Sequence, residues 1–117
     1  MPDRPDPEAF LPLHPLELRI LLAVTRRRAA HGYRIVKEIE ALEGDRFNLH
    51  PANLYRRIRN LLADGLLTEA DPPAGEEDAD PRRTYFDVTE LGTAVVRAET
   101  ARLEELLADA RRCLERT

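Results

Sequence analysis

The clearest hydrophobic pattern in the chain lies between residues 47 and 67. From its first leucine the apolar positions recur at i, i+4, i+7 and i+8, which places them on one face of a helix. These positions are Leu54, Ile58, Leu61 and Leu62. Pro51 suits the first helical turn because it has no amide hydrogen to satisfy. Gly65 can adopt the left-handed conformation that ends a helix, so the pattern predicts a helix from Pro51 to about residue 64.

The opposite face of this helix is basic and amide-rich. It carries Asn53, Arg56, Arg59 and Asn60, with Tyr55 and Arg57 at its flanks. No Asp or Glu occurs between residues 46 and 63. Arginine pairs bidentately with guanine edges and asparagine with adenine edges, so the face suits a DNA major groove. A solvated basic helix on an ordinary domain would carry the same residues.

Two further helices are predicted before this one. Residues 16–28 are apolar on more than one stripe, which indicates burial on two sides, by the core and by a partner subunit. The arginines at positions 26–28 either favour the helix C-terminus or contact DNA phosphate. A turn at residues 31–33 precedes a helix that ends near Leu42, before Gly44.

The order of these helices is that of a helix-turn-helix. The connection over residues 43–50 is longer than the tight bacterial version and is more typical of winged-helix proteins. Residues 66–70 and 83–88 read as two strands joined by a polar, acidic loop, which predicts a β-hairpin wing. Arg82 and Arg83 lie where a wing approaches a phosphate backbone, although charge at a hairpin edge also blocks aggregation.

Thr89 is a good N-cap for a long helix that runs to about Leu114. A small domain has little spare surface for so long an apolar stripe, so a partner helix is the natural cover, and packing onto its own domain is the alternative. The residues predicted to form a dimer are Leu16, Ile20, Leu91, Val95, Leu103, Leu106, Leu107 and Ala110.

The predicted fold is mainly α with a small β-hairpin wing: a winged helix-turn-helix plus a long C-terminal helix. At 117 residues and 43% hydrophobic content, the chain fits one small domain with an appended helix. Residues 1–9 are rich in proline and charge and are predicted to be a disordered tail. Residues 10–88 are assigned to the DNA-binding domain and residues 89–117 to the dimerisation helix.

The charge distribution allows local phosphate binding in a chain whose net charge is −4. Residues 19–59 hold ten Lys/Arg and four Asp/Glu, a net charge of +6, and the rest of the chain carries −10. Such asymmetry indicates a basic face with acidic flanks.

Composition argues against catalysis, cofactors and membranes. Three histidines and one cysteine show no metal-ligand spacing, and no Gly-rich phosphate loop occurs, so neither an enzyme nor a metal site is expected. Cys113 alone cannot form an intrachain disulfide and fits a reducing cytosol. The first residues lack the apolar segment of a signal peptide, and the longest apolar run, residues 20–24, is too short to span a membrane. We therefore expect a cytoplasmic protein.

Taken in order, five segments resemble the PadR family of bacterial winged-helix transcription regulators, in its short subtype with one C-terminal helix. They are ILLAV (20–24), HGYRIVKEIE (31–40), PANLYRRIRNLLADGLL (51–67), DPRRTYFDVTELG (80–92) and AETARLEELL (98–107). The resemblance implies a homodimer that represses nearby genes and is released by a small molecule or another signal. The family usually has Ser before the proline and Gly-Thr before the Leu-Tyr pair. This chain has His50, Ala52 and Asn53 there, so the family's base preference is not carried over.

Candidate DNA contacts follow from this arrangement. Asn53, Arg56 and Arg59 are expected to read bases or backbone, and Tyr55 either places its hydroxyl on a phosphate or packs half-buried. Tyr33 and Lys37 are phosphate candidates because the second helix of the motif crosses the backbone. His31 is expected to cap or pack the turn.

Two functions remain open. The first is a homodimeric regulator of a palindromic double-stranded DNA operator, with a small-molecule pocket between the first and last helices. The alternative is a winged helix that only binds other proteins, for which the acidic net charge is a mild argument. The +6 segment and the acid-free helix favour DNA.

Overall fold

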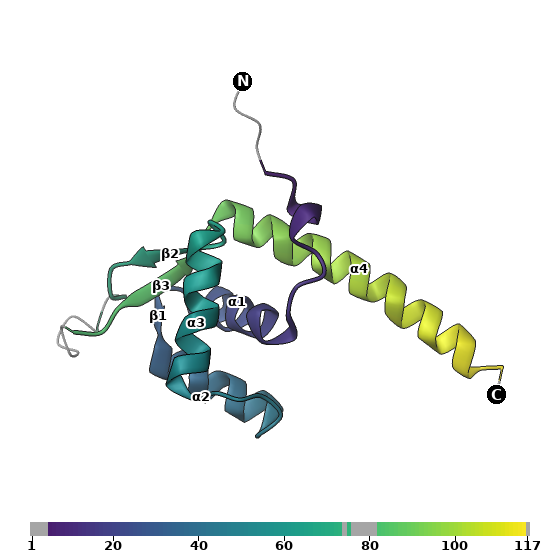
Figure 1. The fold of residues 1–117 in the computed structure, drawn as a ribbon, viewed down its shortest axis with the longest axis horizontal. Helices are drawn as coiled ribbons and strands as arrows, with labels where there is room; N and C mark the ends of the chain where they lie inside the picture. The colour runs from purple at the N-terminus through teal and green to yellow at the C-terminus, as the bar shows by residue number, and fades with distance from the viewer. Residues whose placement is uncertain (1–4, 74, 76–81, 117) are drawn as a thin grey trace.

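The computed structural model describes residues 5–73, 75 and 82–116 (Figure 1). These residues form a mainly helical domain with a small antiparallel sheet, as the sequence predicted. In chain order the elements are η1 (Pro7–Phe10), α1 (Pro15–Arg27), β1 (Ala30–His31), α2 (Gly32–Glu43), α3 (Pro51–Ala63), β2 (Leu67–Ala70), β3 (Tyr85–Val88) and α4 (Glu90–Leu114).

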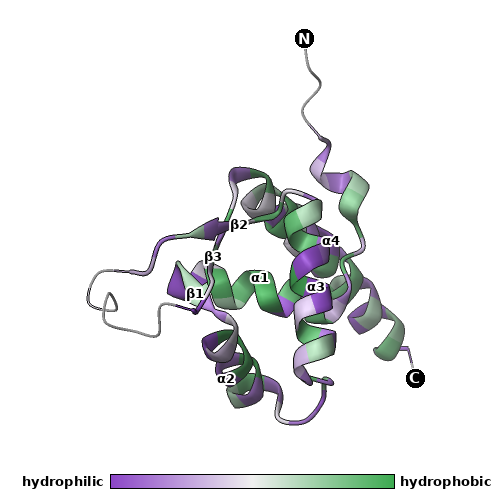
Figure 2. Cartoon of the chain, turned by 60° about the vertical axis from the view of Figure 1, so that its left-hand side comes forward, coloured by the Kyte–Doolittle hydropathy of each residue, from purple (hydrophilic) through white to green (hydrophobic). Residues whose placement is uncertain are grey.

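Helix α1 lies at the centre of the domain (Figure 2). It is largely apolar, and other elements of the chain surround it. His14 caps it, because its Nδ1 accepts a hydrogen bond from the Leu16 amide at 3.1 Å. The residues that α1 buries are Leu16, Ile20, Leu21, Ala23 and Val24. Helices α2, α3 and α4 all pack against it, so α1 fixes how they lie relative to one another.

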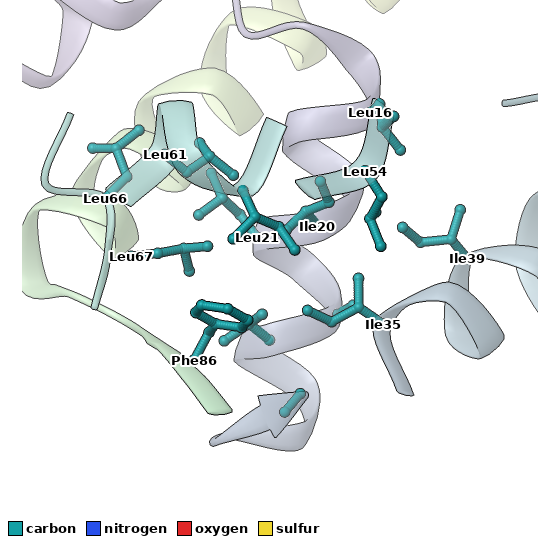
Figure 3. Close-up of a cluster of buried hydrophobic side chains, with 14 of the residues drawn as sticks. Leu16, Ile20, Leu21, Ile35, Ile39, Leu54, Leu61, Leu66, Leu67 and Phe86 are labelled. Carbon is teal, nitrogen blue, oxygen red and sulfur yellow. The ribbon is translucent and has the colours of Figure 1, made fainter. Parts of the chain in front are cut away.

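The core joins α1 to the inner faces of α2, α3 and the sheet (Figure 3). Ile35 and Ile39 come from α2, Leu54 and Leu61 from α3, and Phe86 from β3. The inner face of α3 is thus the one that the periodicity predicted. Helix α3 begins at Pro51 and ends at Ala63, one residue from the predicted end.

The sheet differs from the predicted two-stranded hairpin. Strands β2 and β3 pair antiparallel, with Leu67 opposite Val88, and β1 pairs with the other edge of β3. We predicted a turn at residues 31–33, but Ala30–His31 is a strand and Gly32 already begins α2. Two residues are too few to show the alternation that marks a strand in sequence. In the wing loop predicted at residues 71–81, residues 74 and 76–81 lie outside the described residues.

Part of the segment that the sequence predicted as a tail, residues 1–9, packs against α4. Residues Pro7–Phe10 form a 3-10 helix that packs on α4, and the Asp6 carboxylate accepts a hydrogen bond from the Glu8 amide at 3.0 Å. Residues 1–4 of that predicted tail lie outside the described residues.

A buried carboxylate on α4 fastens this N-terminal segment. Glu99 is 1% exposed, and its Oε2 accepts a hydrogen bond from the Leu13 amide at 2.9 Å. Arg102 donates from Nε to Oε1 and from Nη2 to Oε2, the latter at 3.1 Å. These hydrogen bonds, first that from Arg102, lower the pKa of Glu99 below its usual range despite the opposing effect of burial.

Replacing Glu99 by Gln should therefore flatten the acid limb of the stability curve. A lowered pKa in the folded state adds stability above the unfolded pKa of about 4.3, and this stability is lost as the pH falls through the folded pKa. Thermal unfolding between neutral pH and about pH 3 should show a steeper decline of Tm for the wild type than for Glu99→Gln. The exposed Glu105→Gln is the control and should follow the wild type. Parallel curves for the wild type and Glu99→Gln would contradict the proposed role of the carboxylate.

Candidate nucleic-acid interface

Helix α3 presents its polar face outward because its apolar face is committed to the core. His50 caps it through an Nδ1 that accepts a hydrogen bond from the Ala52 amide at 3.2 Å, so the histidine replaces the usual serine chemically. Arg56 and Arg59 are exposed, and Asn53 is half-buried. Among the residues that the structure describes, neither arginine pairs with a carboxylate.

Asn53 holds a neighbouring arginine in place. Its Nδ2 donates to the Asn48 carbonyl at 2.7 Å, and its Oδ1 accepts from Arg56 Nη2 at 2.7 Å. The amide therefore links the segment that enters α3 to the guanidinium one turn along the helix. A preorganised guanidinium loses less freedom when it binds a guanine edge or a phosphate.

Five of the eight predicted DNA contacts meet at one cleft of about 380 Å³ between the start of α2, α3 and the wing strands. They are Tyr33, Tyr55, Arg59, Arg82 and Arg83. His31 lines the cleft from the end of β1, Gly32 from the start of α2, and Glu69 from β2. Segments far apart in sequence thus present several cations and hydroxyls around one hollow.

Tyr55 packs against α2 and also faces solvent. Its ring packs on the first residue of α2, since a Cβ at Gly32 would lie only 2.2 Å from the Tyr55 hydroxyl. The side chain nevertheless remains 40% exposed and lines the cleft. Glycine at position 32 therefore makes room for a phenol that contacts both helices and faces solvent.

Lys37 lies outside this cleft but close to it. Its Nζ is 5.3 Å from the centre of the Tyr33 ring, a cation–π contact, and 3.8 Å from a Glu40 oxygen. A second hollow, of about 360 Å³, is lined by Lys37, Arg34, Arg26 and Arg27. Arg26 and Arg27 share the Glu38 carboxylate at 3.4 and 3.3 Å, which supports a structural role for these two arginines.

Arg57, predicted at the flank of the polar face, turns inward instead. Its Nη1 lies 3.1 Å from Glu17 on α1, and both side chains are largely buried. Sequence alone does not show this pair because 40 residues separate its members. The pair fastens α3 to α1.

Three residues predicted to form a dimer are core residues. Leu16, Ile20 and Val95 are covered by their own chain, so they cannot contact a partner in this conformation. A two-faced apolar helix needs cover on both sides, and here α4 and α3 supply it to α1 without a second subunit. Leu91 and Leu103 are half-buried, whereas Leu106, Leu107 and Ala110 are exposed on the part of α4 that extends beyond the domain (Figure 1).

A further cleft of about 380 Å³ lies between α1 and α4, where an effector pocket was predicted. Its apolar lining includes Leu18, Leu22, Phe47 and Leu103. Two ion pairs border it, Arg19 with Glu43 and Arg102 with Glu99. An apolar hollow with a few charges suits an amphiphilic small molecule.

Within residues 5–73, 75 and 82–116, no group of three or more His, Cys, Asp or Glu side chains could hold a metal ion. The helices in that part of the chain are all too short or too polar to cross a membrane.

Comparison with protein families matches residues 20–98 to the Transcriptional regulator PadR-like family. A comparison with curated proteins gave no match. Among solved structures, a padr family transcriptional regulator from Eggerthella lenta is similar, with 28% identity, a TM-score of 0.63, and coverage of 86% of this chain and 83% of that one. A PadR-like transcriptional regulator from Bacillus cereus has a TM-score of 0.69 at 14% identity, with 85% and 90% coverage, and thus shares the fold.

Proposed function

The chain belongs to the PadR-like family of transcriptional regulators, and from this premise we propose that it is a homodimeric repressor. It would bind a palindromic DNA operator in the cytoplasm and leave it when a small molecule binds. The observation that carries the proposal is the exposed polar face of α3 beside the cleft that gathers Tyr33, Tyr55, Arg59, Arg82 and Arg83.

In this proposal α3 enters the major groove and the wing follows the backbone. Arg56 and Arg59 lie one turn apart on the outward face, so both can reach base edges of one groove segment. Arg82 and Arg83 would lie on phosphates, and Tyr33 and Tyr55 would donate hydroxyl hydrogens to them. The phosphate contacts supply affinity and register, and the base contacts supply sequence preference.

We propose that dimerisation uses the outer half of α4. Leu106, Leu107 and Leu114 are 54%, 50% and 69% exposed, which is unusual for three leucines on one helix of a small domain. Because η1 and α1 already cover the first half of α4, the partner would pack on the half that follows Leu103. A twofold axis there would match a palindromic operator.

The cleft between α1 and α4 is the proposed effector site. Phe47, which lines it, belongs to the connection that leads from α2 into α3. A bound amphiphile would contact this connection and α4 at once. It could therefore change both the entry of α3 into the groove and the spacing of the two subunits, which is how a single ligand would lower operator affinity.

Base reading predicts a loss of specificity when the α3 arginines are shortened. Selection from a randomised duplex pool would supply the preferred sequence, and titrations at several salt concentrations would compare it with a scrambled duplex. Arg56→Ala or Arg59→Ala should cost about 1–3 kcal/mol on the selected duplex and much less on the scrambled one. Arg83→Ala should weaken both and lower the salt slope by about one unit. An unchanged ratio between the two duplexes in both α3 variants would favour the protein-interaction alternative.

Dimerisation predicts that charge on the leucine stripe of the outer half of α4 separates the subunits. Light scattering should give about twice the 13.4 kDa chain mass for the wild type at micromolar concentration and one chain mass for Leu106→Lys with Leu107→Lys. Glu105→Lys with Ala108→Lys, which places two lysines on the opposite face of the same exposed turns, is the control. A wild type that is monomeric and still binds the selected palindrome tightly would contradict the dimer.

The effector site predicts binding that a bulky side chain can block. A screen of aromatic and cationic amphiphiles should find compounds that raise the Tm of the wild type. At a ligand concentration one hundred times Kd, binding adds about 2.7 kcal/mol to the free energy of unfolding. Leu18→Trp would fill the cleft and should abolish the shift, whereas Thr68→Trp on β2 should leave it intact. Equal shifts in the wild type and Leu18→Trp would place the binding elsewhere.

A further inference from the structure

Asn53 lies in the first turn of α3, and both polar atoms of its side-chain amide are bonded within the protein. Nδ2 donates to the Asn48 carbonyl at 2.7 Å, and Oδ1 accepts from Arg56 Nη2 at 2.7 Å. Only this orientation of the amide satisfies both neighbours, because a carbonyl needs a donor and a guanidinium needs an acceptor. The Asn48 side chain accepts a hydrogen bond from the His50 amide at 3.1 Å, so the anchoring carbonyl belongs to a hydrogen-bonded turn.

The guanidinium of Arg56 can keep this bond and still read a base. Arginine offers two edges for bidentate pairing, one between Nη1 and Nη2 and one between Nε and Nη2, and Nη2 has one hydrogen on each edge. Whichever hydrogen Asn53 accepts, the other edge keeps both of its donors. Guanine presents O6 and N7 as a matching pair of acceptors in the major groove. Arg56 is also exposed, whereas Asn53 is half-buried, so the guanidinium is the more accessible of the two groups.

An uncharged partner suits the task of holding this arginine. A carboxylate would bind the guanidinium more strongly, but it would also neutralise the charge that attracts the phosphate backbone. The amide of Asn53 restricts the side chain and leaves its charge in place. In the described part of the chain, Arg59 on the same face makes no comparable hydrogen bond, so it provides an internal reference.

We infer that Asn53 is a positioning residue, which fixes Arg56 for one guanine of each half-site and does not itself read a base. The inference rests on the proposed DNA-binding function and narrows the part expected of Asn53 in it. A side chain that is ordered before binding loses less freedom on contact, and it favours the base whose acceptors lie along its fixed direction. Preference at that base pair therefore depends on both residues, although only Arg56 touches the base.

Base-pair preference separates positioning from reading. Each base pair of the selected duplex would be substituted singly, and its affinity measured for the wild type and the variants. Arg56→Ala should relax the preference at one G·C pair of each half-site by roughly tenfold or more. Asn53→Ala should relax the same pair by roughly two- to tenfold, because the guanidinium must then be ordered on binding. Relaxation at an A·T pair instead would show that Asn53 reads adenine directly, and would overturn the inference.

The double variant tests whether Asn53 acts only through Arg56. Once Arg56 is alanine, Asn53→Ala should cause no further loss of preference at that pair. Asn53→Ala combined with Arg59→Ala is the matched control, and its losses of affinity for the selected duplex should multiply. Asn60→Ala, which removes another amide from the outer face of α3, should leave the preference at the Arg56 pair unchanged. Multiplying losses at that pair for Asn53 and Arg56 would contradict the positioning role.

Asn53→Asp keeps the acceptor and is the conservative rescue. Aspartate can accept from Arg56 but cannot donate to the Asn48 carbonyl. This variant should retain the preference at the Arg56 pair, while its affinity for the selected and scrambled duplexes falls equally because the new charge repels phosphate. A loss of preference as large as that of Asn53→Ala would overturn the role of the acceptor.

The protein without DNA gives an independent measurement. Nitrogen relaxation by NMR would compare the Nε–H groups of Arg56 and Arg59. The order parameter of Arg56 should exceed that of Arg59 in the wild type and should fall to the same level in Asn53→Ala. Equal order parameters in the wild type would overturn the inference. Should Asn53→Ala fail to fold, the wild-type comparison and Asn53→Asp still decide it.

The failures of the two proposals are distinguishable. A wild type that binds neither duplex removes the DNA-binding function and this inference with it. A wild type that binds, with Arg56→Ala relaxing one G·C pair and Asn53→Ala relaxing none, overturns the positioning role and leaves the function standing.

Discussion

Burial of α1 on two faces is the constraint on which the rest of the structure depends. Ile20, Leu21 and Val24 are fully buried, and α2, α3, α4 and the sheet all supply atoms to cover them. Because each element must bury its own apolar stripe on this one helix, their mutual angles are not independent. The hollow between α2, α3 and the wing is thus a consequence of core packing. The ion pair between Arg57 and Glu17 further holds α3 against α1.

The same packing decides which cations remain available to an anionic partner. Arg19, Arg26 and Arg57 each face a carboxylate of another element. In the part of the chain that the structure describes, Arg56 and Arg59 have no such carboxylate. An acidic chain can therefore present a basic face. Some of its arginines form ion pairs with carboxylates of other elements, whereas those on the outer face of α3 do not.

The N-terminal segment and α4 form a second group of contacts, away from the polar face of α3. The buried Glu99 carboxylate fastens the backbone at Leu13 to α4, and the cleft beside it reaches Phe47 in the connection before α3. Contacts at this cleft and contacts at the proposed DNA face thus share one short segment of chain. That continuity is the physical basis for the proposed coupling between a ligand and DNA.

The sequence by itself determined the elements whose signal is local. The apolar spacing of α3 and the Thr89 cap and length of α4 are local patterns, and both helices were predicted nearly to the residue. Only the tertiary structure decided what depends on distant partners: the two-residue strand β1, the inward turn of Arg57, the burial of Leu16, Ile20 and Val95, and the packing of η1 on α4. The contact between His31 and Arg83 belongs to this group, since 52 residues separate them. Periodicity reports which face of a helix is apolar, but it does not report which element covers that face.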